Sequence, residues 1–208
     1  MKHLIGVYDY TVVLTYLSLF SALTGLLQTT KGNYTIAVVC IMLSGLLDAF
    51  DGPIARTKKN RTDDEKSFGI QLDSLCDVIS FGVVPAILCY HLGANGFLGR
   101  VLVFLFVLCA LIRLAFFNVL ETNRQSKQSS KNKVYRGLPV TTIAIILPIV
   151  YTFKFVLGSP SFVFLIHVML ALVSLLFVLD FRVRKPDWAR LLGKADSSEE
   201  EKEYETVF

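Results

Sequence analysis

Residues 97–120 read FLGRVLVFLFVLCALIRLAFFNVL, and only Arg100 and Arg113 in this stretch are charged. The apolar residues form one continuous run, without the alternation of a half-buried strand or the polar face of a surface helix. A run of about 18 or more apolar residues is typical of a helix that crosses a membrane. Similar runs occupy residues 69–91 and 161–181. The sequence therefore predicts an all-α, polytopic membrane protein.

The composition of the whole chain agrees with this prediction. Of the 208 residues, 53% are hydrophobic and 18% are charged, whereas a soluble domain has roughly 25% charged residues. These values exclude a soluble globular enzyme, a disordered chain and a collagen-like chain. A β-barrel is disfavoured, because its strands would alternate in polarity and run for only about ten residues.

Turn residues divide the apolar runs into six predicted transmembrane helices. Gly, Asn, Ser and Pro punctuate the short connections at residues 31–33, 93–96 and 158–160. The six spans are expected at about residues 11–28, 34–56, 69–91, 97–120, 138–157 and 161–182. We expect one six-helix domain over residues 1–185 and a mobile, acidic C-terminal tail over residues 186–208.

The basic residues predict the orientation of the chain. Most of the 21 Lys and Arg residues lie at the termini and in the connections around residues 56–68 and 121–136. Only Lys31, Arg100 and Lys154 fall on the opposite side. Because cytoplasmic loops retain an excess of Lys and Arg, both termini and both long connections are expected to face the cytoplasm.

Four acidic residues lie inside or at the ends of the second and third spans. Asp48 and Asp51 are three residues apart, and Asp73 and Asp77 are four apart, so each pair shares one helix face. The two helices are antiparallel, which places both pairs at a similar membrane depth. Charges in a membrane are unfavourable unless they are compensated. Hard oxygen ligands favour Mg²⁺, Mn²⁺ or Ca²⁺, and two such cations would fit this cluster.

The residues around the acids indicate a phosphate ligand. Gly52 and Gly69 leave room for a ligand, and Ala55 is small and lies on the same face as Asp51. Arg56 carries a planar guanidinium that suits phosphate oxygens. Two alternatives are salt bridges between the acids and nearby Lys and Arg residues, and an ion-conducting acidic cluster. Salt bridges do not explain the glycines beside both pairs, and no acidic or polar relay for ions continues through the later spans.

Residues 48–77 read DAFDGPIARTKKNRTDDEKSFGIQLDSLCD. This segment resembles the signature D-x2-D-G-x2-A-R-x(n)-G-x3-D-x3-D of the CDP-alcohol phosphatidyltransferases. Three further segments are similar to the phosphatidylserine synthase branch of that family: SFGVVPA at 80–86, RLAFFN at 113–118 and YRGLP at 135–139. The resemblance covers about residues 10–180.

The resemblance implies a homodimeric enzyme with six membrane helices and an active site open to the cytoplasm, most simply in the bacterial cytoplasmic membrane. The implied reaction transfers the phosphatidyl group of CDP-diacylglycerol to L-serine and releases CMP. It also implies residue roles, which are as follows. Two divalent cations, Mg²⁺ or Mn²⁺, are bound by Asp48, Asp51, Asp73 and Asp77. The CDP site is formed by Asp51, Gly52, Ala55, Arg56 and Gly69. Asp77 is also the catalytic base for the serine hydroxyl.

Binding of serine requires a cation for its carboxylate. Arg113, within an apolar span, and Arg136, at the mouth of the fifth span, are the candidates, together with Asn118. Arg113 could instead pair with backbone carbonyls, and Arg136 could anchor the chain at the membrane or contact lipid phosphate. Membrane lipids are expected partners, and nucleic acid is not.

Two other functions stay open from the sequence. The same chemistry could use another acceptor, glycerol 3-phosphate or an inositol phosphate, for which the basic connection at residues 121–136 could supply a cationic pocket. A non-enzymatic nucleotide-lipid binder or a small transporter is the alternative from another class. Release of CMP from the purified protein would distinguish an enzyme from a binder.

Overall fold

The long apolar runs of the sequence form helices, as expected, in the computed structural model of the protein. The structure describes residues 6, 10–55, 58, 62–126, 135–180 and 182–183. The tail predicted at residues 186–208 lies outside the described residues. The division into one domain and a tail therefore remains a prediction.

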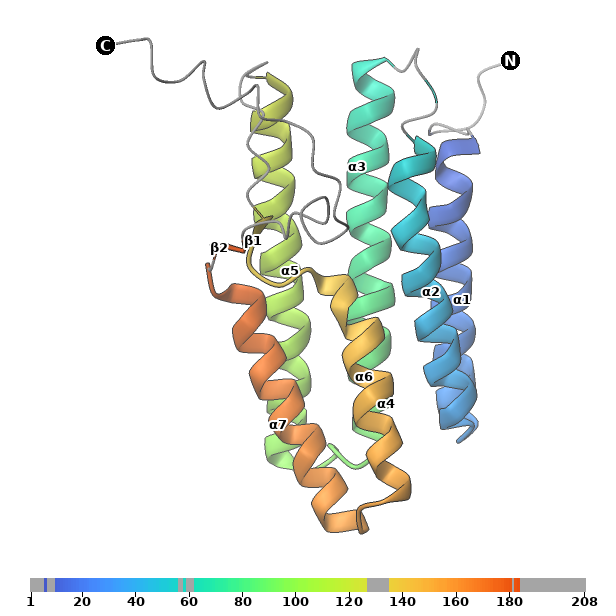
Figure 1. Cartoon of the computed structure of the whole chain (residues 1–208), viewed down its shortest axis with the longest axis vertical. Helices are drawn as coiled ribbons and strands as arrows, with labels where there is room; N and C mark the ends of the chain where they lie inside the picture. Colours follow the sequence, from blue (N-terminus) through green and yellow to red (C-terminus); the bar gives the residue numbers. More distant parts are fainter. Residues whose placement is uncertain are drawn as a thin grey trace, which may run out of the picture.

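Helices lie side by side in a bundle and are joined by short turns at one end (Figure 1). They are α1 (Val13–Thr30), α2 (Tyr34–Ala55), α3 (Asp63–Asp77), α4 (Val84–His91), α5 (Phe97–Ser126), α6 (Ile143–Thr152) and α7 (Ser159–Val178). Short helical turns extend or connect them: η1 (Tyr10–Val12), η2 (Val78–Val83), η3 (Val140–Thr142) and η4 (Phe153–Phe155). Two strands of two residues each, β1 (Tyr135–Arg136) and β2 (Arg182–Val183), pair antiparallel.

Within the described residues, five helices are long and apolar enough to cross a membrane, by length and composition. They cover Val13–Thr30, Tyr34–Ile54, Asp64–His91, Phe97–Glu121 and Ser159–Val178. The span expected at 138–157 corresponds to a shorter apolar helix, Val140–Phe155. Its capacity to cross a membrane remains a prediction.

The third helix begins before the start of its predicted span. Residues 63–68 were expected in a charged connection, but α3 begins at Asp63. The reason is a capping box: the Thr62 hydroxyl accepts a hydrogen bond from the Glu65 N–H, and the Glu65 carboxylate accepts one from the Thr62 N–H. This arrangement satisfies two N–H groups that the first turn of a helix leaves free.

A π-helical turn, η2, joins α3 to α4. The N–H of Val84 donates to the carbonyl of Ile79, five residues earlier rather than four. Pro85 follows directly and has no N–H to donate, so it interrupts the α-helical ladder at this position. A π-helical turn is one of the ways in which a helix absorbs such an interruption.

Small residues allow the helices that carry the acidic residues to pack closely. A Cβ added to Gly25 of α1 would lie 3.0 Å from Cβ of Cys40, on α2. A Cβ added to Gly45 of α2 would lie 2.5 Å from Cβ of Ala144, on α6. Close packing on both sides of α2 fixes the position of its last turns, where the acidic residues lie.

Candidate metal centre

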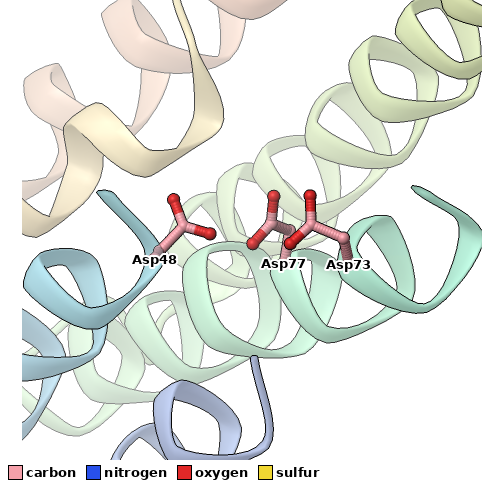
Figure 2. Close-up of side chains that lie close together, drawn as sticks. All are labelled: Asp48, Asp73 and Asp77. Carbon is pink, nitrogen blue, oxygen red and sulfur yellow. The ribbon is translucent and has the colours of Figure 1, made fainter. Parts of the chain in front are cut away.

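Three carboxylates converge between α2 and α3 (Figure 2). Asp48 comes from α2, and Asp73 and Asp77 come from successive turns of α3. One oxygen of each carboxylate lies within 4.8 Å of an oxygen of each of the others. Asp77 is buried, while Asp48 and Asp73 are half-buried. The structure thus brings together three of the four acidic residues that were predicted to form one site.

The surroundings of these carboxylates fit a bound cation. Oδ1 of Asp73 is buried and has no hydrogen-bond donor among the residues that the structure describes. The negative charges of Asp48, Asp73 and Asp77 also repel one another. Buried like charges with an unsatisfied acceptor are unfavourable unless a positive group compensates them. A set of carboxylate oxygens is the ligand set that Mg²⁺ or Mn²⁺ prefers.

Asp51, the fourth predicted ligand, lies outside this group of three. Its carboxylate is close enough to those of Asp48 and Asp73 to repel them. Oδ2 of Asp51 accepts a hydrogen bond of 3.2 Å from the hydroxyl of Thr15, on α1. The role of Asp51 as a metal ligand therefore remains a prediction, and the structure adds a partner for its carboxylate.

The sequence analysis did not identify Thr15. A signal was present in the sequence, because Thr15, Ser18, Ser21 and Thr24 recur at every third position. Residues at that spacing lie along one face of a helix. A row of hydroxyls on one face of a membrane helix indicates a polar contact with a neighbouring helix.

The predicted CDP-binding residues lie at the end of α2 and on α3. Among the residues that the structure describes, no atom outside the neighbouring turn of α2 would lie within 4 Å of a Cβ added to Gly52, so the described part of the chain leaves space beside the backbone here. Gly69 is half-buried on α3, one turn before Asp73. Ala55 ends α2, but its side chain and the whole of Arg56 lie outside the described residues. Their contact with a nucleotide remains a prediction.

Arg113 is a buried cation on α5. Its Nε donates a hydrogen bond of 3.2 Å to the carbonyl of Leu138, and its guanidinium lies 5.8 Å from the centre of the Phe117 ring. The Asp180 carboxylate, after the end of α7, also interacts with it electrostatically. The contact with Leu138 is of the kind expected if Arg113 pairs with backbone carbonyls. A contact with serine remains a prediction.

The other two predicted serine contacts lie on α5 and β1. Asn118 links α5 to α3, because its Oδ1 accepts a hydrogen bond of 2.7 Å from Ser74 and its Nδ2 donates one of 3.3 Å to Gln71. These partners lie on either side of Asp73 in the sequence. Arg136 belongs to β1, where its backbone pairs with that of Arg182, but its side chain is outside the described part of the chain.

Comparison with known proteins identifies the family. Residues 10–180 match the family described as CDP-alcohol phosphatidyltransferase. The chain belongs to this family. The three converging carboxylates lie in the family motif that was recognised at residues 48–77. The long apolar helices and membership of a lipid-biosynthesis family indicate a membrane protein.

Several relatives within the family of CDP-alcohol phosphatidyltransferases carry the name CDP-diacylglycerol–serine O-phosphatidyltransferase. One from Saccharomyces cerevisiae is 36% identical, over 69% of this chain and 52% of its own length. One from Helicobacter pylori is 32% identical, over 67% of this chain and 56% of its own length. A relative from Methanothermobacter thermautotrophicus, named archaetidylserine synthase, is 33% identical, over 78% of this chain and 66% of its own length. The chain thus spans about half to two thirds of the length of these relatives.

Proposed function

We propose that this protein is a phosphatidylserine synthase that transfers the phosphatidyl group from CDP-diacylglycerol to L-serine. The observation that carries the proposal is the convergence of Asp48, Asp73 and Asp77 within the motif of the family. The names of the relatives from S. cerevisiae and H. pylori support serine as the acceptor. The choice of acceptor rests on that similarity.

The proposed reaction exchanges one P–O bond for another. The serine hydroxyl oxygen bonds to the phosphorus that carries diacylglycerol, and the bond from that phosphorus to the bridging oxygen breaks. CMP leaves with the bridging oxygen. The hydroxyl proton passes to a carboxylate, which we assign to Asp77, the most buried member of the group. An ionised carboxylate within reach of a nucleophile can act as its general base.

The two divalent cations would be bound by four residues, Asp48, Asp51, Asp73 and Asp77. Mg²⁺ or Mn²⁺ at this position supplies positive charge against the diphosphate and the departing CMP, which phosphoryl transfer requires. The identity of the cation is part of the proposal. Removal of any one of these carboxylates is expected to weaken cation binding.

The nucleotide is proposed to bind beside the last turn of α2. The open space at Gly52 would let a phosphate approach the backbone, and Asp51, Ala55, Arg56 and Gly69 would complete the CDP site. For serine, Arg113 and Arg136 would offer guanidinium groups to the carboxylate. Asn118 would contribute through an amide that also contacts α3.

The arrangement in the membrane completes the proposal. Val140–Phe155 would be a sixth span, and both termini and the carboxylates would face the cytoplasm, in accord with the distribution of Lys and Arg. The bacterial cytoplasmic membrane and a homodimer follow from the family resemblance. Diacylglycerol chains would remain in the bilayer while CMP and serine exchange with the cytoplasm.

The test is incubation of the purified protein with CDP-diacylglycerol, Mg²⁺ or Mn²⁺ and one acceptor at a time, with the lipid product identified by mass. Phosphatidylserine and an equal amount of CMP are the expected products. Faster use of glycerol 3-phosphate or an inositol phosphate would change the acceptor and retain the transferase. Absence of CMP with every acceptor would favour a nucleotide-lipid binder or a transporter.

A further inference from the structure

We propose that Thr15 is a positioning residue that sets the orientation of the Asp51 carboxylate in the metal centre. Thr15 lies in the first turn of α1, outside the motif at residues 48–77. It is 6% exposed, and its hydroxyl donates to Oδ2 of Asp51 over 3.2 Å. It thus contributes a hydrogen bond from a third helix to a site built on α2 and α3.

A row of three hydroxyls on α1 determines where Thr15 meets α2. Ser18 contacts Ser44, with 2.8 Å between the two hydroxyl oxygens, and Ser21 donates to the carbonyl of Cys40 over 2.8 Å. The row continues with Thr15, which meets Asp51. Cys40, Ser44 and Asp51 lie on one face of α2, because they are separated by four and seven residues, which are about one and two helical turns. The contacts of Ser18 and Ser21 therefore hold this face of α2 against α1, and the Thr15 hydroxyl reaches Asp51 about two turns beyond Ser44.

The hydrogen bond from Thr15 occupies one oxygen of the Asp51 carboxylate and leaves the other oxygen for the metal centre. Oδ2 accepts the hydroxyl proton of Thr15. The carboxylate also lies close enough to Asp48 and Asp73 to repel them, so Asp51 faces the cluster as well as α1. A donor fixed on one oxygen restrains rotation of the carboxylate. Because the Asp51 carboxylate is already restrained, its side chain loses little further conformational freedom when it binds a cation.

This inference rests on the proposed metal site, and partners of metal ligands affect metal affinity. Removal of such a partner typically weakens metal binding by about 10–100-fold. Thr15→Val retains the shape of the side chain and removes the donor, so we expect a loss in this range. Thr15→Ser retains the hydroxyl and should bind metal like the wild type.

The experiment measures binding of Mn²⁺ to the full-length protein in detergent, by electron paramagnetic resonance of the free ion. Thr24→Val is the matched control, because Thr24 lies on the same helix and its hydroxyl donates to the carbonyl of Phe20 within α1. Thr15→Val is also tested in an Asp51→Ala background, where its effect should vanish if it acts through Asp51. Thermal unfolding confirms that each variant is folded, and Thr15→Ala replaces Thr15→Val if the latter does not fold.

The results separate this inference from the proposed function. Weaker Mn²⁺ binding in Thr15→Val, near-normal binding in Thr15→Ser and no added effect in the Asp51→Ala background would support it. Wild-type affinity in Thr15→Val, or an equal loss in the Asp51→Ala background, would overturn it. A wild-type protein that binds Mn²⁺ but does not transfer lipid to serine would overturn the proposed function and leave the role of Thr15 intact.

Discussion

Replacement of Asp77 by Asn should affect catalysis and stability in opposite directions. The change retains the size of the side chain but removes its charge and its ability to accept a proton. Loss of a general base typically lowers the rate by about 10²–10⁴-fold. Loss of a cation ligand would lower it further. We therefore expect turnover to fall by at least about 100-fold.

The distances in the site give the size of the opposite effect. Oxygens of Asp48, Asp73 and Asp77 lie within 4.8 Å of one another, and at this separation two full charges repel by about 3.5 kcal/mol at an effective dielectric constant of about 20. A proton shared among the carboxylates relieves part of this repulsion. Relief of even about 1 kcal/mol raises the melting temperature of a chain of this size by roughly 2–4 °C.

The assay compares thermal unfolding of wild type and Asp77→Asn in detergent, with chelator and with Mg²⁺, alongside CMP release. In chelator the variant should melt above the wild type. In Mg²⁺ the wild type should gain more stability than the variant, because it keeps the full set of ligands. Asp64→Asn is the control, since Asp64 lies on the exposed first turn of α3 and should change neither turnover nor the response to Mg²⁺.

Two results would refute this reasoning. Near-normal CMP release by Asp77→Asn would exclude this residue as the base. A lower melting temperature than wild type in chelator would show that the carboxylates do not repel one another in the folded protein. In the latter case no repulsion among the carboxylates would require a compensating cation.

Four further predictions concern the metal, the acceptor, the packing of α2 and the nucleotide site. Activity should vanish in excess chelator and return with Mg²⁺ or Mn²⁺, and full turnover without metal would contradict the site. Arg113→Lys should raise the KM for serine more than that for CDP-diacylglycerol, because Lys keeps the charge without the planar fork; an unchanged KM in steady-state assays would place the serine carboxylate elsewhere. Gly45→Ala should lower the melting temperature, since its Cβ would lie 2.5 Å from Cβ of Ala144 and overpacking costs about 1–3 kcal/mol. Gly52→Ala, with open space around its Cβ, should melt like wild type but bind CDP-diacylglycerol less tightly, and a matched loss of stability in both glycine variants would contradict this assignment.

The helices could be predicted from the sequence because continuous apolar runs leave few alternatives. The residues at which the helices begin and end were harder to predict than the helices themselves. The charges at residues 63–68 indicated a connection, yet the Thr62–Glu65 capping box supports a helix there. The apolar segment at 138–157 was expected to resemble the other spans, but it forms a shorter helix at Val140–Phe155. Periodicity locates the middle of a helix, whereas local hydrogen bonds decide where it begins.

The core of the site could be predicted because it depends on spacing within single helices. Asp73 and Asp77 share a face of α3 by their separation alone, and Asp48 meets them across α2 and α3. The contact of Thr15 with Asp51 could not be derived in this way, because it depends on the axial register of α1 against α2. That register depends on packing and on the contacts of Ser18 and Ser21.

The π-helical turn η2 determines how the two halves of the α3–α4 helix are rotated relative to each other. Successive residues of an α-helix turn by about 100° around its axis, and a π-helical turn holds one residue more than an α-helical one. A regular α-helix over the same six residues, Val78–Val83, would therefore contain one residue too many and would rotate the whole of α3 by about that angle relative to α4. Asp73 and Asp77 would then turn away from Asp48 although every ligand remained in the sequence. The π-helical form of this six-residue segment is thus a determinant of the metal centre in its own right, and a relative with one residue fewer here is expected to have a regular α-helix and the same arrangement of carboxylates.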